Sequence, residues 1–275
     1  MKSKDIRKLA ANPRFIPGVY NYCDRWCERC PLSNRCLNHA MEQAEDDPDG
    51  SGAARDLSNR KFWDRLHRKF QSTLEMLHEN ARVRGIDLED PKLQAEVKAQ
   101  ERAERRLAVK NRPLAQAAMA CVKAADQWFE AAQPIFNAKG IELETLARLE
   151  AGNPRAEAAE LSEFVEVIRW YQHFIHVKLC RAIESRASEE LETDGEMKQF
   201  PKDSDGSAKI ALIAMDRSIS AWTGLREALG DDPDGILDLL AQLAAIRRET
   251  EKLFPEARAF VRPGFDEPRA IPANA

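Results

Sequence analysis

The sequence predicts an all-α protein, in which a bundle of four to six helices follows a short, irregular, cysteine-rich arm. Three observations carry this prediction. Apolar residues recur at three- and four-residue spacing through most of the chain, which is the period of an amphipathic helix. No segment shows the sustained apolar–polar alternation of a strand. Glycines and prolines, which end helices, divide the periodic segments into pieces joined by mostly short loops.

The composition is that of a globular protein with a charged surface. The chain has 275 residues, of which 43% are hydrophobic and 32% are charged, and its formal net charge is −4. This balance argues against a dedicated nucleic-acid-binding protein, which usually carries a basic excess. Because the sequence contains neither a long apolar segment nor a signal-peptide pattern, we expect a cytoplasmic protein with no membrane partner. The oligomeric state stays open.

The chain divides by composition into a metal-binding arm, residues 1–50, and a helical bundle, residues 51–275. Two prolines and a glycine within residues 1–22 predict irregular backbone before the cysteines. A short helix is expected from Leu37 to Ala44. The acidic segment 45–53, rich in glycine and proline, is typical of a linker.

After the linker, each helix is predicted from its period and its end signals. Ser58 is the expected N-cap of the first helix. Prolines that follow an aspartate or asparagine open several others, because proline is tolerated in the first turn. The helices are expected over residues 59–84, 92–110, 114–133, 142–149, 156–186 and 207–229, and from 232 to about 255. Residues 189–207 are expected to be a loop, and the tail after residue 255 an extended strap.

Four of the six cysteines lie within 14 residues, at Cys23, Cys27, Cys30 and Cys36. In a chain without a secretion signal, such clustering indicates metal or redox chemistry rather than disulfides. Thiolates suit zinc or an iron–sulfur cluster. Structural zinc sites usually have two Cys-x2-Cys pairs far apart, whereas the gaps here are three, two and five residues. This crowding, together with the proline after Cys30, favours a [4Fe–4S] cluster on the four cysteines, with zinc as the alternative.

The run Cys27-x2-Cys30-Pro-x4-Cys36-Leu resembles the core of the WhiB-like iron–sulfur regulators. The resemblance covers about 20 residues and implies a cluster on Cys27, Cys30 and Cys36, with Cys23 as the fourth ligand. In that family the first cysteine lies farther upstream. The family's glycine–tryptophan turn and basic tail are missing here, so no transcriptional role is implied. The whole chain is also similar to a family of uncharacterised bacterial helical proteins, which implies no activity.

A polar stripe runs along the otherwise apolar helix expected over residues 156–186. At 100° per residue, one sector of this helix contains Glu166, Arg169, His173, His176 and Cys180. We weigh two interpretations of the stripe: a pocket or metal site inside the bundle, or the solvent-facing side of the helix. The two remaining cysteines, Cys121 and Cys180, lie in apolar segments and are expected to be small core residues.

Three functions remain open from the sequence. The preferred one is a non-enzymatic iron–sulfur protein that acts as a redox sensor, electron carrier or interaction partner, and whose partner is another protein. The second is an enzyme with its active site in the bundle, near Glu166, His173 and His176. The third is a structural scaffold stapled by zinc.

Overall fold

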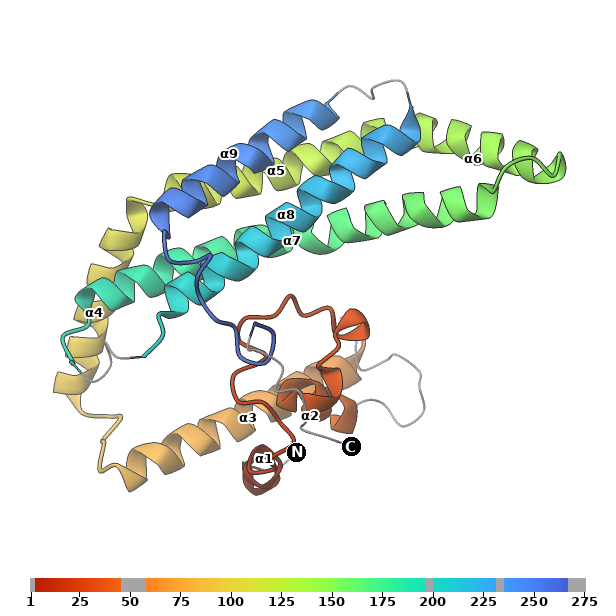
Figure 1. The fold of residues 1–275 in the computed structure, drawn as a ribbon. Helices are drawn as coiled ribbons and strands as arrows, with labels where there is room; N and C mark the ends of the chain where they lie inside the picture. The colour runs from red at the N-terminus through yellow and green to blue at the C-terminus, as the bar shows by residue number, and fades with distance from the viewer. Residues whose placement is uncertain (1–2, 46–57, 196–199, 231–234, 267–275) are drawn as a thin grey trace, which may run out of the picture. The chain divides into compact units, whose positions relative to one another are not determined.

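The computed structural model describes residues 3–45, 58–195, 200–230 and 235–266 (Figure 1). Over these ranges it contains nine α-helices, two short 3-10 turns and no strand, which confirms the predicted all-α class. The contacts divide the chain into unit 1, residues 1–102 and 261–275, and unit 2, residues 103–260. The boundary expected between residues 50 and 51, and all of the expected linker but its first residue, lie outside the described residues.

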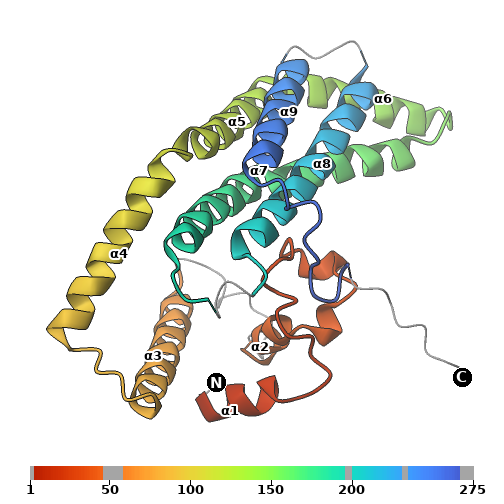
Figure 2. The same cartoon turned by 60° about the vertical axis from the view of Figure 1, so that its left-hand side comes forward.

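Unit 2 is built on a four-helix bundle, as predicted. Its helices are α5 (Arg112–Ala131), α7 (Pro154–Leu191), α8 (Asp203–Leu229) and α9 (Ile236–Leu253). The pair α7 and α8 shares the most extensive contact, and α5 and α9 close the ring because α5 packs on α7, α9 packs on α8, and the two pack on each other (Figures 1 and 2). Helix α6 (Gln133–Arg148) packs against α7 outside this ring.

The core of unit 2 contains large side chains from several helices. Trp222 of α8 and Tyr171 of α7 are 2% and 1% exposed. Complete burial of one large apolar side chain stabilises a fold by about 1.5–3 kcal/mol. Trp128 of α5 meets Trp222 edge to face, with ring centroids 5.0 Å apart, so an aromatic contact joins α5 to α8. The other large apolar side chains with almost no exposure are Ile168, Leu179, Ile210, Leu212, Met215, Leu225 and Ile236.

The connection between α7 and α8 is shorter than the sequence predicts. Helix α7 continues to Leu191, and α8 begins at Asp203 rather than at residue 207. Side chains on α7 hold the first turn of α8: Glu189 accepts a 2.9 Å hydrogen bond from the backbone N–H of Ser204, and Arg181 donates to Asp203 at 2.6 Å. The Glu189 bond satisfies a backbone N–H at the start of α8, and the Arg181–Asp203 ion pair fixes the first residue of this helix, so the polar composition did not prevent helix formation.

The sequence predicted a short helix over residues 142–149, and the predicted first residue was wrong. Helix α6 begins at Gln133 and runs through Gly140. Pro134 lies in its first turn, where the missing N–H costs nothing. A glycine inside a helix costs about 1 kcal/mol relative to alanine, which lowers the stability of the helix without ending it.

Unit 1 contains α1 (Ser3–Ala10), α2 (Leu37–Glu45), α3 (Arg60–Val83) and the first part of α4 (Pro91–Val109), which continues into unit 2. Helix α2 confirms the predicted short helix after the cysteines. Helix α1 corrects the expectation that the arm is irregular from its start, and Arg7 of α1 pairs with Glu79 of α3 at 2.8 Å. The N-cap of α3 is Asn59 rather than Ser58, because the Asn59 side chain accepts a 3.0 Å hydrogen bond from the backbone N–H of Lys61.

The segment after α9 forms turns, and it passes from unit 2 into unit 1 after residue 260. In unit 2, Arg258 donates to Asp216 of α8 at 2.6 Å. In unit 1, Gly264 lies against the arm: a Cβ on Gly264 would be 2.8 Å from Cδ1 of Ile16 and 3.3 Å from Cδ1 of Leu32. The predicted strap is therefore packed over residues 255–266, while its remainder lies outside the described residues. No helix in the described ranges has the length and apolar character needed to cross a membrane.

Candidate metal centre

The cysteine segment is folded by tight turns that begin or end at cysteines. Two 3-10 turns, Cys27–Arg29 and Ser33–Arg35, precede α2. The N–H of Cys30 donates to the carbonyl of Cys27 at 3.2 Å, and the N–H of Cys36 donates to the carbonyl of Ser33 at 3.2 Å. Cys27 starts the first turn, and Cys30 and Cys36 directly follow the first and the second turn. The two turns therefore fold the predicted metal-binding segment into a short loop.

Between the first two cysteines the backbone adopts an unusual conformation. Arg25 has a φ of 61°, a left-handed conformation that costs a residue with a Cβ roughly 1–2 kcal/mol. The next N–H, that of Trp26, donates to the Asp24 carboxylate at 3.2 Å. The side chain of Trp26 is 6% exposed and the Arg29 guanidinium lies 3.9 Å from the centroid of its ring. Burial of Trp26 thus holds the strained turn in place.

The surroundings of the loop disfavour the charged form of three of its four thiols. Burial and, to a smaller extent, the charges of Glu42, Cys23 and Cys36 together raise the pKa of Cys27 to about 11. Burial also raises the pKa of Cys23 and that of Cys30, and the charge of Cys36 adds to both. All four cysteines are half-buried and none is in a disulfide. Because thiolates within one loop repel one another, a bound cation would stabilise the thiolate forms of these cysteines.

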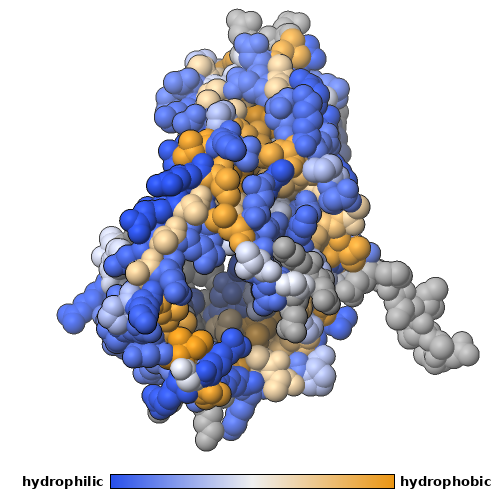
Figure 3. All heavy atoms as spheres, turned by 90° about the vertical axis from the view of Figure 1, so that its left-hand side faces the viewer, coloured by the Kyte–Doolittle hydropathy of each residue, from blue (hydrophilic) through white to orange (hydrophobic). Residues whose placement is uncertain are grey.

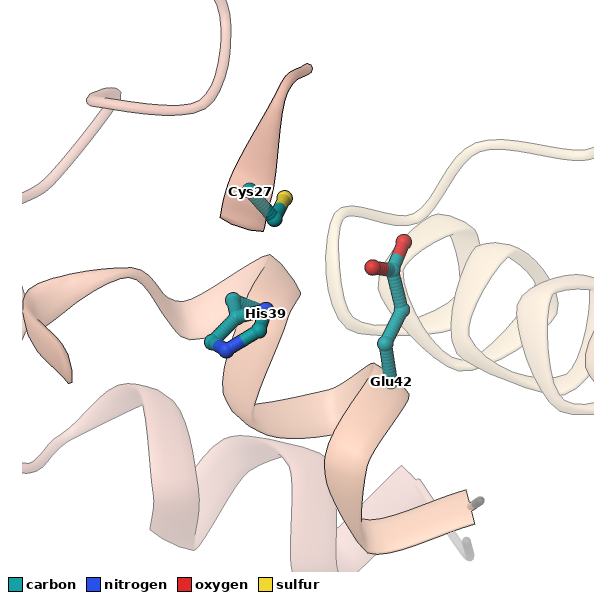
Figure 4. A group of neighbouring side chains, drawn as sticks. All are labelled: Cys27, His39 and Glu42. Carbon is teal, nitrogen blue, oxygen red and sulfur yellow. The ribbon is translucent and has the colours of Figure 1, made fainter. Parts of the chain in front are cut away.

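Helix α2 adds two ligand types to the cysteines. One ligand atom each of Cys27, His39 and Glu42 lies within 4.8 Å of the others, and all three residues are half-buried (Figure 4). The backbone N–H of His39 lies 3.5 Å from Sγ of Cys36, to which it donates. The sequence prediction did not include Glu42. The signal was present, because residues 39 and 42 are three apart on the helix that leaves Cys36 and therefore share a face.

The polar stripe of α7 lies at the surface of unit 2. Glu166, Arg169 and His173 are exposed, and His176 is half-buried. The Arg169 guanidinium pairs with Asp126 of α5 at 2.7 Å, and it stacks 3.9 Å from the centroid of the Phe129 ring. The stripe is therefore the solvent-facing edge of α7, where it meets α5. The exposure of Glu166 and His173 favours the solvent-facing interpretation of the stripe.

An open groove in unit 2 lies on other helices. It has a volume of about 640 Å³ and lies between α5 and α9. Leu114, Ala117 and Ile246 line it, and Figure 3 shows apolar side chains scattered among polar ones in the upper part of the face it draws. No residue of the α7 stripe lines this groove.

The remaining pair of potential reactive groups is His176 and Cys180. Nδ1 of His176 is 2.9 Å from the carbonyl oxygen of Ala115, so this nitrogen carries the proton. Sγ of Cys180 lies 3.6 Å from Nε2 and 4.0 Å from Nδ1. These similar distances put the sulfur beside the ring and not along the Nε2 lone pair, so the pair lacks the alignment of a nucleophile and its base. Cys121 is 7% exposed and is a core residue, as predicted.

A comparison of the chain with models of protein families, with curated proteins and with solved structures finds no match.

Proposed function

We propose that the protein binds a [4Fe–4S] cluster through Cys23, Cys27, Cys30 and Cys36, and that it acts as a redox sensor, electron carrier or interaction partner of another protein. The observation that carries the proposal is that four half-buried cysteines, none of them in a disulfide, lie within 14 residues that are folded by two tight turns. Four thiolates are the usual ligand set of such a cluster. The donor set therefore fits the group, which would supply one-electron chemistry when bound.

The surroundings of the cysteines support a redox role. Reduction potentials of iron–sulfur clusters depend on burial, on nearby charge and on hydrogen bonds to the sulfurs. Trp26, which directly precedes Cys27 in the chain, is buried. The backbone N–H of His39 donates to the Cys36 sulfur. Glu42 adds a negative charge that acts on Cys27. We place the protein in the cytoplasm, where reduced thiols persist and such sites are assembled.

Zinc remains the second candidate, because a ring nitrogen of His39 lies within 4.8 Å of the Cys27 sulfur and mixed cysteine–histidine sets are common in structural zinc sites. In that case the loop would be a zinc-stapled scaffold. No observation favours the enzyme hypothesis for the α7 stripe, whose residues are paired or exposed at the surface of unit 2.

The test is metal analysis of the full chain purified without oxygen. We expect a brown protein with about four iron and four sulfide per chain, as a [4Fe–4S] cluster requires. Cys30→Ser should lose this iron, whereas Cys180→Ser, which changes a half-buried cysteine outside the loop, should retain it. A colourless wild-type protein that carries one zinc and no iron would reject the cluster and leave the scaffold.

A further inference from the structure

Three different ligand types meet where α2 approaches the first 3-10 turn. The Cys27 sulfur, a ring nitrogen of His39 and a carboxylate oxygen of Glu42 all lie within 4.8 Å of one another (Figure 4). In a tetrahedral site with zinc–ligand bonds of about 2.0–2.3 Å, neighbouring ligand atoms are about 3.3–3.8 Å apart. The group therefore needs to contract by roughly 1 Å, which small rotations about side-chain bonds provide.

The local structure holds each of the three side chains near this geometry. Glu42 accepts a 2.8 Å hydrogen bond from the Asn38 amide one turn earlier on α2. His39 is placed by its own backbone, whose N–H donates to the Cys36 sulfur. Cys27 begins the 3-10 turn Cys27–Arg29, which Cys30 follows directly. Two ligands on one helical turn and a third on a tight turn form a partly preorganised site, which reduces the entropy lost on binding.

We propose that Cys27, His39 and Glu42 bind one divalent ion of the zinc class when the cluster is absent. The fourth position takes a water molecule. On binding, the Cys27 thiol gives its proton to solvent, and the sulfur, an imidazole nitrogen and a carboxylate oxygen become the ligands. A mixed sulfur, nitrogen and oxygen set suits zinc or cobalt(II), whereas a cluster requires the additional thiolates.

The inference extends the proposed function, since it concerns the same loop in its cluster-free form. Cys27 belongs to both ligand sets, so the ion and the cluster exclude each other. The consequence is measurable: zinc added before reconstitution should slow cluster assembly. Replacing His39 or Glu42 should relieve this inhibition, because each of these residues is a ligand of the ion and neither is a ligand of the cluster.

The experiment uses the full chain, stripped of metal and reduced in the absence of oxygen. Cobalt(II) is titrated in, and binding is followed by its visible absorption bands, with zinc as a competitor. We compare wild type with His39→Ala, with Glu42→Gln, which keeps the shape of the side chain, and with Cys30→Ser as the control. His39→Ala and Glu42→Gln should weaken binding at least about tenfold, since even changes in residues that only support ligands cost 10–100-fold. Cys30→Ser should bind within about threefold of wild type, because Cys30 is outside the triad.

Two outcomes would overturn the inference. Unchanged affinity in both His39→Ala and Glu42→Gln would exclude these ligands, provided that circular dichroism shows the wild-type helix content. Loss of affinity in Cys30→Ser equal to that in His39→Ala would place the ion among the four thiolates. Iron and sulfide analysis of the anaerobic protein tests the proposed function separately: an iron-free protein whose cobalt binding depends on His39 rejects the cluster and keeps the ion site.

Discussion

Phe164 of α7 occupies the space that a side chain at Gly224 of α8 would need. An ideal Cβ on Gly224 would lie 2.4 Å from Cζ of Phe164 and 2.6 Å from its Cε1. Such distances are far below van der Waals contact, so α7 and α8 approach this closely at Phe164 because residue 224 is glycine. Helices α7 and α8 share the most extensive contact in unit 2, and this glycine is part of the reason.

Gly224→Ala should therefore destabilise unit 2. Alanine gains about 1 kcal/mol in helix propensity, but the methyl group collides with the Phe164 ring, and overpacking of this kind costs about 1–3 kcal/mol. We expect a net loss of about 1 kcal/mol in the free energy of unfolding, measured by urea denaturation followed by circular dichroism.

The matched background is Phe164→Leu, which removes the ring atoms nearest to Gly224. In that background Gly224→Ala should be neutral or stabilising by up to about 1 kcal/mol, because only the propensity gain remains. An equal loss in both backgrounds would show that another neighbour, and not Phe164, opposes a side chain at residue 224.

Asp216→Asn should weaken the attachment of the segment after α9. Burial raises the pKa of Asp216, but hydrogen bonds from Arg258 and Arg247 outweigh burial and leave the pKa lowered. A lowered carboxyl pKa contributes stability above its unfolded value near 4, and this stability is lost as the pH falls through the lower folded pKa. Because the pair is partly exposed, we expect wild type to exceed the variant by no more than about 1 kcal/mol at pH 7.

Unfolding curves at pH 7, 5 and 3 check this prediction. The gap between wild type and Asp216→Asn should persist at pH 5 and shrink below about pH 4. Glu144→Gln provides a control, because Glu144 and Arg148 form an exposed pair on a single helix and should contribute little. A gap for Asp216→Asn that is independent of pH would mean that packing, and not charge, is lost.

Cys121 should make unit 2 sensitive to alkaline pH. Burial raises the pKa of this thiol to about 11, whereas an unfolded cysteine titrates near 8.5 to 9. The folded state therefore keeps its proton where the unfolded state loses it, so stability falls as the pH rises from about 9 to 11. At pH 10 the loss should be about 1.4 kcal/mol, since one pKa unit corresponds to 1.36 kcal/mol.

The comparison with Cys121→Ala isolates this effect from other groups that titrate at high pH. The variant loses packing at every pH, but its stability should decline less between pH 8 and pH 10 than that of wild type. Parallel pH profiles for the two proteins would contradict the assignment of the effect to Cys121.

Gly264→Ala should loosen the cysteine segment, although residue 264 is more than 200 positions away from it. Gly264 has a φ of 74°, and a Cβ there would lie 2.8 Å from Ile16. Gly85→Ala is the matched control, because Gly85 has a φ of 67° and nothing within 4 Å of its Cβ position. Both variants incur left-handed strain of about 1–2 kcal/mol, but only Gly264→Ala also collides with the arm.

Amide hydrogen exchange over residues 15–36 measures the difference. Each additional kcal/mol of local destabilisation should speed exchange roughly fivefold. We expect faster exchange in Gly264→Ala than in Gly85→Ala, and equal rates would show that the strap does not stabilise this segment.

Much of the fold was predictable because local signals and tertiary structure agree. Pro91 and Pro154 open helices where the sequence places them, and α2 follows Cys36 as expected. The errors lie where a distant residue decides a helix end. Glu189 on α7 determines where α8 begins, through a bond to Ser204 that no local pattern reveals.

The site was predictable in part for the same reason. Clustering in the sequence singled out the four cysteines as a candidate site, and the structure folds them into one short segment of tight turns. The approach of Glu42 to Cys27 depends on how α2 turns back on the loop, and periodicity carries no information about that turn. The environment of the α7 stripe was not predictable from the sequence. Arg169 pairs with Asp126, which lies 43 residues earlier on another helix, so the pattern of α7 alone could not decide between solvent and a pocket.

The docking of the strap on the arm has a consequence for the order of events during synthesis. Cys36 leaves the ribosome long before Gly264, and at about 5–20 residues per second the interval is roughly 10–50 s. Throughout this interval the nascent cysteine loop lacks the segment that packs on Ile16 and Leu32, while the helices of unit 2 are being made. Metal delivery during translation would therefore meet a more open loop than delivery to the finished chain.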